Sequence, residues 1–537
     1  MKKHLLSILA LSIGIILGLL SMVLPAPAKF DAPGFSAERA RQDIDIIARA
    51  PHSVWDQGSL QPVRDHIRSR LMSLGLAPAT MRYPEVTDRS GHRYPLENIS
   101  ASIPGRSGSF VLLVAHYDSA PRKKISEASY GAADDGYGVA TMLEIAGLLV
   151  RNKIPLENGV RFLFTDAEET GLLGAAAEMD HNLAAYRDVN LVINLEARGV
   201  KGPVVMFETG KHNLATIRLF QKARRPFSYS FSVDVYRKMP NGTDFSEFTK
   251  KGFAGLNFAV LDDLSFYHTQ RDSLENISLT SLQHYGEQVF PMVLAYTADA
   301  RFAGVQAFAS TENMVYFTWL PGLFFAWPAT WDRVFCGILG LVFFLWAGGM
   351  IAKKRARLGA SLLWLLGWFA MAAMALGAGL GTSWLASRIT NIPWRLTYMP
   401  NVPGERFWLW ALMLMLALGS FGLAARSSQK TARDRSPLLG ALGLNLLLTV
   451  GTLFLLPGGT FLFSIPLLVA LVAVFLADWG KRPRIALVAV VFIVSIFIPV
   501  LHVIFLALTL GALGLVLWLA AIPLALMATL AAEASNR

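Results

Sequence analysis

Seven long apolar runs fill the C-terminal part of the chain and limit its fold more than any other feature. They occupy residues 334–352, 360–385, 407–425, 437–456, 460–478, 485–506 and 509–532. Each run is long enough to cross the hydrocarbon core of a bilayer as a helix, and each is apolar on all sides, unlike a surface helix of a soluble domain. The sequence therefore predicts an all-α, polytopic membrane domain of about seven helices over residues 333–537.

A further apolar run lies near the start of the chain, where residues 5–24 follow the basic sequence MKKH. Ala26 and Ala28 around Pro27 resemble a signal-peptidase site, so cleavage is one outcome. The run is longer than the apolar part of a typical signal peptide and is long enough to span a membrane. We therefore favour a retained transmembrane anchor over residues 1–29, and in either case the following residues are exported.

Basic residues gather in alternate loops between the apolar runs. The three loops contain Lys353, Lys354, Arg355 and Arg357; Arg426, Lys430, Arg433 and Arg435; and Lys481, Arg482 and Arg484. Basic loops face the cytoplasm, so eight spans would place both termini inside and residues 30–332 outside. The net charge of +11 is therefore explained by the basic loops of a protein in a lipid membrane, and we do not expect a nucleic-acid partner. We expect the periplasmic side of a bacterial inner membrane, although glycosylation triplets at Asn98, Asn241 and Asn276 keep an organelle lumen open.

Residues 30–332 have the pattern of an α/β domain with a mixed sheet. Apolar runs at 110–115 and 160–165 are short and rich in branched or aromatic residues, as in buried parallel strands, and helical spacing appears between them at 139–150. These segments predict a β-α-β unit, in which chemistry is expected at the carboxyl ends of the strands. The remaining predicted elements are strands at 96–103, 189–195 and 254–261 and a closing helix at 279–298.

Polar side chains follow the first two strands of this unit and fill the glycine-rich loop before its helix. They are His116, Asp118, Asp134, Asp135, Asp166, Glu168 and Glu169. Six carboxylates and one histidine that converge on one rim would repel each other unless cations bind there. Oxygen ligands together with imidazole suit zinc or a similar divalent ion.

Five motifs, in this order along the chain, resemble the co-catalytic zinc aminopeptidase family (clan MH). They are HYDS, GAADD, DAEETG, NLEARG and FYHTQRD. This family includes bacterial leucyl aminopeptidases, glutamate carboxypeptidase II and the glutaminyl cyclases. NLEARG, the VVMFETG segment after it and the later GTDFSEF most resemble the membrane-embedded branch, the endoplasmic-reticulum and vacuolar-membrane metallopeptidases. The resemblance covers roughly residues 36–300 and implies two zinc ions per chain and a peptide substrate.

The resemblance also implies a role for each motif residue. One zinc ion would take His116 and Glu196, the other Glu169 and His268, and Asp134 would bridge both. Asp118 would orient the first histidine, Glu168 would be the general base, and Tyr267 would stabilise the oxyanion. A strained cis peptide bond would precede Asp135. Many soluble aminopeptidases have Asp at the third-strand position, where this chain has Glu196.

Several other polar residues receive a structural interpretation or none. His52 lies in a Pro-His-Ser turn and is interpreted as structural, and His212 is assigned no role. Asp244 is either the N-cap of a helix or a residue on the rim of the site. His502 lies inside an apolar run, where a hydrogen bond to a neighbouring helix is the simpler interpretation. Cys336 is the single cysteine, so no intrachain disulfide is possible.

Together these features predict a membrane-anchored zinc metallopeptidase, an aminopeptidase that hydrolyses peptides outside the cytoplasm with a metal-bridged hydroxide. The first alternative is a glutaminyl cyclase-like single-zinc acyltransferase, which shares HYDS and the paired glutamates. The second is a pseudo-peptidase whose membrane bundle is a transporter or a scaffold. The full ligand set argues against a dead site, and the absence of paired charges along a path through the bundle argues against transport.

Overall fold

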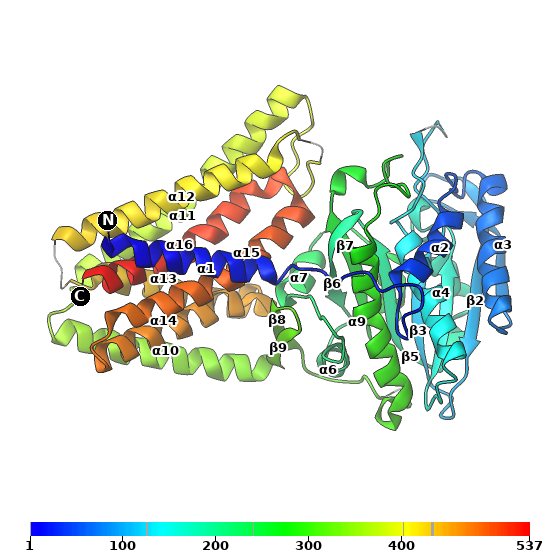
Figure 1. The fold of residues 1–537 in the computed structure, drawn as a ribbon, viewed down its shortest axis with the longest axis horizontal. Helices are drawn as coiled ribbons and strands as arrows, with labels where there is room; N and C mark the ends of the chain where they lie inside the picture. Colours follow the sequence, from blue (N-terminus) through cyan, green and yellow to red (C-terminus); the bar gives the residue numbers. More distant parts are fainter. Residues whose placement is uncertain are drawn as a thin grey trace. The chain divides into compact units, whose positions relative to one another are not determined.

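A computed structural model describes residues 2–124, 127–239, 241–304, 306–400, 402–430 and 434–536 (Figure 1). The chain divides into two compact units. The sheet unit comprises Val23–Met314 and Pro321–Ala326, and the helical unit comprises Met1–Met22, Val315–Leu320 and Trp327–Arg537. Arg433, one of the basic residues used to predict the membrane topology, lies outside the described residues.

The sheet unit is built on a seven-stranded sheet with the strand order β1-β2-β4-β3-β5-β7-β6. Its strands are β1 (Ala79–Thr87), β2 (Arg93–Ile103), β3 (Phe110–His116), β4 (Gly159–Thr165), β5 (Val189–Ala197), β6 (Lys201–Thr209) and β7 (Gly255–Asp262). The middle strands β4, β3, β5 and β7 are parallel, whereas β1, β2 and β6 run antiparallel to their neighbours. The predicted mixed sheet, with a parallel β-α-β unit at its centre, is confirmed.

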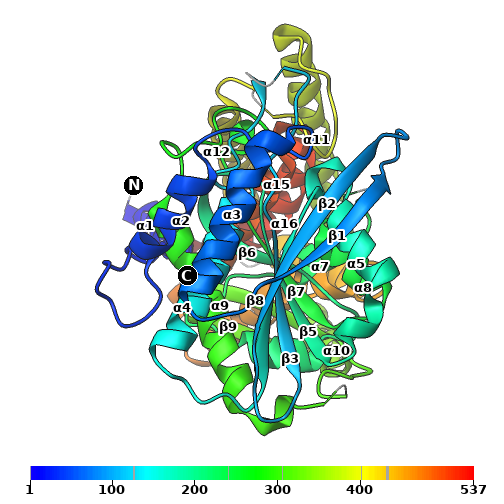
Figure 2. The same cartoon turned by 90° about the vertical axis from the view of Figure 1, so that its right-hand side faces the viewer.

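Helices cover both faces of this sheet. They are α2 (Ala37–Ile47), α3 (Gln57–Ser73), α4 (Gly136–Arg151), α5 (Leu173–His181), α6 (Leu214–Phe220), α7 (Ser230–Tyr236), α8 (Asp244–Lys250) and α9 (Leu279–Ala298). Figure 2 shows α2, α4 and α9 on one side of the sheet and α5 and α8 on the other, in agreement with their contacts. All residues of β3 and β5 are buried as a result, which explains why these strands are continuous apolar runs.

The order of the central strands creates a switch point beside β3. The chain passes from β3 through α4 to β4 on one side, and then through α5 to β5 on the other side of β3. At such a point the connections leave in opposite directions, so the loops after the strands separate and leave room for a site. The helix α4 begins here with Asp135 as its N-cap, whose Oδ1 accepts a hydrogen bond from the Gly138 N–H at 2.9 Å.

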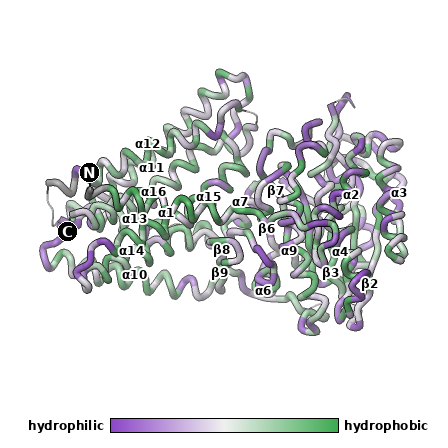
Figure 3. The backbone as a smooth tube through the Cα atoms, viewed as in Figure 1, coloured by the Kyte–Doolittle hydropathy of each residue, from purple (hydrophilic) through white to green (hydrophobic). Residues whose placement is uncertain are grey.

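The helical unit contains seven helices that are long and apolar enough to cross a membrane, counted over the described residues. They are α10 (Ala329–Ala352), α11 (Leu358–Thr390), α12 (Glu405–Lys430), α13 (Ser436–Leu455), α14 (Phe461–Trp479), α15 (Ala486–Leu508) and α16 (Leu513–Asn536). Figure 3 shows that hydrophobic residues dominate them along most of their length. The seven C-terminal apolar runs are therefore confirmed as helices. A two-stranded hairpin, β8 (Met314–Leu320) and β9 (Leu323–Pro328), precedes α10.

The N-terminal apolar run forms a shorter helix than the sequence suggested. The helix α1 is Lys2–Leu20, and its apolar part, Leu5–Leu20, is not among the seven long apolar helices. It packs on α15 through two glycines one helical turn apart. A Cβ atom added to Gly14 would lie 2.7 Å from Val494 Cβ, and one added to Gly18 would lie 2.7 Å from Ile498 Cβ. Small residues with this spacing let two membrane helices approach closely.

One buried cluster of charged residues in the helical unit joins helix ends. Arg435, whose side chain is 2% exposed, lies just before α13. It donates to both carboxylate oxygens of Asp478 near the end of α14, at 2.6 and 2.7 Å, and to Glu533 near the end of α16, at 3.1 and 3.2 Å. This cluster joins the ends of three helices and does not form a path between them.

Candidate metal centre

The carboxyl edge of the sheet brings three groups of candidate ligands together, and two of these groups share Asp134. His116, Asp134 and Glu196 form the first group, and Asp134, Glu169 and His268 form the second. Within each group, the ligand atoms all lie within 4.8 Å of one another. All five residues predicted from the motifs to bind metal therefore meet in one place.

Each of these residues is positioned by the sheet or by the turn that follows a strand. His116 ends β3, and Glu196 lies near the end of the neighbouring parallel strand β5. Val114 pairs with Asn194, so the residues two positions further along each strand point to the same face of the sheet. As a result, Glu196 Oε2 lies 3.7 Å from His116 Nε2.

Asp134 turns one oxygen toward each histidine. Its Oδ1 lies 3.3 Å from His116 Nε2, and its Oδ2 lies 3.4 Å from His268 Nε2. The peptide bond between Asp134 and Asp135 is cis, as the resemblance implied. The two oxygens of Asp134, each facing one histidine, are arranged as expected of a carboxylate that bridges two cations, each also held by one histidine.

Asp272 holds the loop that carries Asp134, and the sequence analysis assigned it no role. Its carboxylate accepts hydrogen bonds from the backbone N–H groups of Ala133, at 2.7 Å, and Asp134, at 3.1 Å. It is the last residue of the FYHTQRD motif, four positions after His268. The motif supplied the signal, but only the structure shows that its aspartate reaches back to the loop before α4.

Asp118 does more than orient the histidine. His116 Nδ1 lies 2.9 Å from the backbone carbonyl oxygen of Asp118 and 3.3 Å from its carboxylate. The carboxylate also accepts the backbone N–H groups of Glu168, at 2.9 Å, and Glu169, at 3.3 Å. Asp118 therefore fixes the histidine and the glutamate turn relative to each other.

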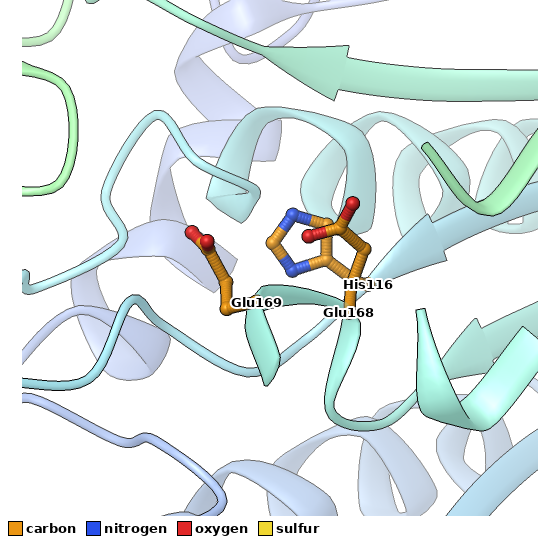
Figure 4. Close-up of side chains that lie close together, drawn as sticks. All are labelled: His116, Glu168 and Glu169. Atoms are coloured by element: carbon orange, nitrogen blue, oxygen red, sulfur yellow. The ribbon is translucent and has the colours of Figure 1, made fainter. Parts of the chain in front are cut away.

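Glu168 and Glu169 leave the same short turn, η2 (Glu168–Thr170), which follows β4. Figure 4 shows the Glu169 carboxylate to the left of the His116 ring and the Glu168 carboxylate overlapping the right part of the ring in that view. A ligand atom from each of these three residues lies within 4.8 Å of the others. Glu168 belongs to neither of the two groups that share Asp134, and with His116 and Glu169 it forms a third candidate group.

Asp166 does not join the converging carboxylates, which corrects the sequence analysis. Its Oδ2 forms an ion pair with Arg64 Nη2 at 2.5 Å and accepts the backbone N–H of Glu97 at 3.0 Å. Because both partners come from outside the β-α-β unit, the local sequence gave no sign of this pairing. Asp166 ties α3 and β2 to the end of β4.

Asp244 is not an N-cap. Thr243 caps α8 through a capping box with Ser246, and Asp244 is the first residue of the helix. Its side chain is buried and accepts a hydrogen bond from the hydroxyl group of Thr165. Its charge also helps to raise the pKa of Glu168 and Glu196.

His52 and Tyr267 lie close to the cluster in different ways. His52 is buried, with Nδ1 2.9 Å from the Ala50 carbonyl oxygen, and its backbone N–H donates to Ser119 Oγ at 2.9 Å, which are contacts of a structural histidine. The ring of Tyr267 stacks on that of His268 with 3.6 Å between centroids. Burial, together with the charges of Asp134 and Glu169, raises the pKa of Tyr267, so its hydroxyl remains a proton donor. His212 is exposed in the turn before α6.

The cluster carries more negative charge than its protein partners balance. Burial raises the pKa of Glu169 to about 7 and that of Glu196 to about 8, and neighbouring carboxylates add to both effects. Close contacts with His116 and His268 outweigh burial at Asp134 and hold its pKa below the usual value. Bound cations would remove this repulsion and keep the carboxylates ionised.

Two buried atoms also point to a cation. Among the described residues, Glu169 Oε1 and His268 Nε2 have no hydrogen-bond partner. His268 Nε2 lies 2.8 Å from Glu169 Oε2 without hydrogen-bond geometry, as expected of two atoms that face a common third atom. Two imidazoles and three carboxylates in two groups fit the ligand preference of zinc.

The family of this domain follows from a comparison with protein-family models. Residues 98–293 match the model of peptidase family M28. The chain carries an M28 peptidase domain. The matched residues include all five candidate ligands and the turn with Glu168.

Curated relatives of the M28 domain include membrane proteases of fungi. The chain is 29% identical over 254 residues to a vacuolar membrane protease of Candida tropicalis, which covers 45% of this chain and 27% of the relative. It is 30% identical over 239 residues to a putative endoplasmic reticulum metallopeptidase 1 of Schizosaccharomyces pombe, which covers 43% of this chain and 27% of the relative. This chain thus spans about a quarter of the length of each relative.

Among solved structures, the glutaminyl cyclase of Porphyromonas gingivalis matches 49% of this chain and 99% of its own, with 23% identity and a TM-score of 0.40.

Proposed function

We propose that the M28 domain is a zinc-dependent exopeptidase of the aminopeptidase type that binds two zinc ions. The observation that carries this proposal is that the two ligand groups share Asp134. His116 and Glu196 would hold one ion, Glu169 and His268 the other, and Asp134 both. When bound, the two ions would supply Lewis acidity and lower the pKa of a water molecule at the site.

The chain's own residues supply the proton transfers. Glu168, next to both ligand groups, would accept a proton from the attacking water and pass it to the leaving amine. Tyr267 would donate a hydrogen bond to the oxygen of the scissile carbonyl as it becomes negatively charged. Asp118 and Asp272 would keep the glutamate turn and the Asp134 loop in place while these transfers occur.

The metal count separates this proposal from the cyclase alternative. A single four-coordinate zinc needs three protein ligands and a water molecule, whereas five ligands with one bridge provide three to each of two ions. Full-length protein purified in detergent should bind about two zinc ions and lose peptidase activity with a chelator. His116→Ala should lose one of them and most of the activity. One zinc ion, with His116→Ala still able to cyclise an N-terminal glutamine, would establish the cyclase instead.

We further propose that the seven long helices and α1 span a membrane and that the M28 domain faces away from the cytoplasm. The support is that basic residues concentrate in alternate loops between the helices, although the loop between α11 and α12 contains Arg395. A reporter fused after Ala300 should behave as exported, and one fused after Arg357 as cytoplasmic. The opposite pair of signals would reverse this topology. The periplasmic side of a bacterial inner membrane is the compartment we propose.

A further inference from the structure

A row of three buried polar side chains crosses the sheet behind Glu196. Asn194 on β5 pairs with Asn257 on β7, and Asn257 pairs with Glu208 on β6. The row therefore runs at right angles to three adjacent strands. Asn194 and Asn257 are fully buried, and Glu208 is 8% exposed. None of these residues belongs to a candidate ligand group.

Side-chain hydrogen bonds join the row into one chain that ends on Glu196. Asn194 Nδ2 donates to Glu196 Oε1 at 3.2 Å and to Asn257 Oδ1 at 3.0 Å. Asn257 Nδ2 donates to Glu208 Oε2 at 3.0 Å and to the hydroxyl oxygen of Thr243 at 2.8 Å. The chain thus links the candidate ligand to β6 and to the residue that caps α8.

The carboxylate of Glu208 gives this chain its direction. A carboxylate only accepts hydrogen bonds, so the amide of Asn257 must turn its NH₂ group toward Glu208 and its oxygen toward Asn194. That oxygen in turn draws the NH₂ group of Asn194, which then also faces Glu196. A flipped Asn194 would instead set its oxygen against the oxygens of Asn257 and Glu196.

The last hydrogen bond of this row, from Asn194 to Glu196, determines which oxygen of Glu196 is available to a ligand. Oε1 is held by Asn194, while Oε2 lies on the side of His116, at 3.7 Å from Nε2. Glutamate has one more rotatable bond than aspartate, so a glutamate ligand samples more orientations unless a neighbour restricts it. A fixed amide donor removes that freedom, and partners of this kind orient metal ligands in many sites.

We propose that Glu208, Asn257 and Asn194 are positioning residues that present Glu196 Oε2 to a zinc ion. This inference rests on the proposed function, in which Glu196 binds metal. It assigns a purpose to Glu208, a buried carboxylate that takes no part in the proposed proton transfers. The row also ties Thr243, and with it the start of α8, to the strand that carries Glu196.

The test compares two buried asparagines of the same domain. Asn257→Leu removes the centre of the row. Asn158→Leu is the matched control, because Asn158 is also fully buried and donates two hydrogen bonds, at 2.7 Å to the Tyr296 carbonyl and 2.8 Å to the Asp299 carbonyl. It lies just before β4, at the opposite end of that strand from the candidate metal centre. Both variants lose buried amide contacts, but only one loses the link to Glu196.

Zinc affinity is measured in the full-length protein by competition with a chromophoric chelator. In Asn257→Leu, the affinity of one of the two zinc ions should fall by about 10–100-fold and that of the other should not change. Asn158→Leu should lower the melting temperature without a change in either zinc affinity. Glu208→Met should lower the affinity for the same zinc ion as Asn257→Leu does. Glu208→Gln, which keeps an acceptor oxygen, should retain most of that affinity.

The outcomes separate this inference from the proposed function. Suppose that Glu196→Ala lowers the affinity for one zinc ion, while Asn257→Leu and Glu208→Met keep both affinities within about twofold of the unmodified protein. The row is then only structural and the inference is overturned. If Glu196→Ala itself leaves both affinities unchanged, then the proposed role of Glu196 fails and takes the inference with it. Should Asn257→Leu not fold, the pair Glu208→Met and Glu208→Gln decides the question alone.

Discussion

The sheet unit and the helical unit treat buried charge in opposite ways. In the sheet unit, carboxylates from three different segments converge with two histidines in the two ligand groups that share Asp134. In the helical unit, the buried guanidinium of Arg435 lies at helix ends and is bonded to Asp478 and Glu533. One arrangement leaves negative charge to be balanced by a ligand, and the other balances its charge internally.

The difference follows from what surrounds each unit. A domain with a well-packed sheet core can tolerate repulsion between carboxylates at one edge. A cation that binds there relieves the repulsion, and this relief favours its binding. Helices that cross a bilayer have no such tolerance, because an ionised group in hydrocarbon is costly unless it is paired or reaches the interface. Unbalanced charge therefore marks the candidate site, and balanced charge marks a structural contact.

The largest effect should come from the unbalanced cluster. Glu168→Gln keeps the size of the side chain but cannot accept a proton, so peptide turnover should fall by about 10²–10⁴-fold. Zinc content, measured by atomic absorption on the same sample, should stay the same because Glu168 belongs to neither proposed pair of ligands. Turnover close to that of the unmodified protein would move the general base to another residue.

The next effect tests the balanced cluster. The double substitution Asp478→Ala and Glu533→Ala would leave the buried Arg435 without carboxylate partners, and loss of such pairing destabilises a protein by about 3–5 kcal/mol. The melting temperature in detergent should fall accordingly. Arg484→Ala, an exposed basic residue in the same unit, is the control and should change stability by less than about 0.5 kcal/mol. A double variant as stable as the control would show that the pairing contributes nothing.

A smaller effect is expected where a charge acts through the backbone. Asp272→Ala would leave the N–H groups of Ala133 and Asp134 without their acceptor, so zinc affinity should fall by about 10–100-fold. Asp272→Asn keeps one acceptor oxygen, so its zinc affinity should lie between those of Asp272→Ala and the unmodified protein. Chelator competition measures this directly. Unchanged affinity in Asp272→Ala would mean that the loop before α4 holds its shape without this carboxylate.

The smallest effect concerns packing without charge. Gly18→Ala adds one methyl group at a point where the Cβ atom would meet Ile498 Cβ at 2.7 Å, so the contact of α1 with α15 should weaken by about 1 kcal/mol. Gly337→Ala on α10 is the control, since no atom lies within 4 Å of that position. The melting temperatures of the two variants in detergent should differ. Equal melting temperatures would indicate that α1 contributes little to the helical unit.

Much of the fold could be predicted because its signals are local. An apolar run that spans a bilayer needs no partner to be recognised, and the seven C-terminal runs became seven helices. The β-α-β unit was similarly visible, since β3 and β4 are continuous apolar runs on either side of a helical pattern. The end of α1 at Leu20 was not predicted, because the apolar composition continues beyond the residue at which the helix stops.

The candidate site was only partly predictable, and the carboxylates illustrate the limit. The motifs singled out Asp134 as the bridging ligand, but they placed Asp166 among the converging carboxylates and left Asp244 as either an N-cap or a residue on the rim of the site. Arg64 takes Asp166 out of the cluster, whereas Asp244 is buried against Thr165. These partners come from distant parts of the chain, so spacing within a motif contains no information about them.

The sequence by itself determined which residue types reach the carboxyl edge of the sheet, because strand periodicity and the β-α-β order depend on residues that are close together in the sequence. Only the tertiary structure decided how those residues are held. The row from Glu208 through Asn257 and Asn194 to Glu196 exists because β6, β7 and β5 are aligned in a particular register. Register is set by the packing of the whole sheet, and for that reason hydrogen bonds between its strands cannot be read from any one of them.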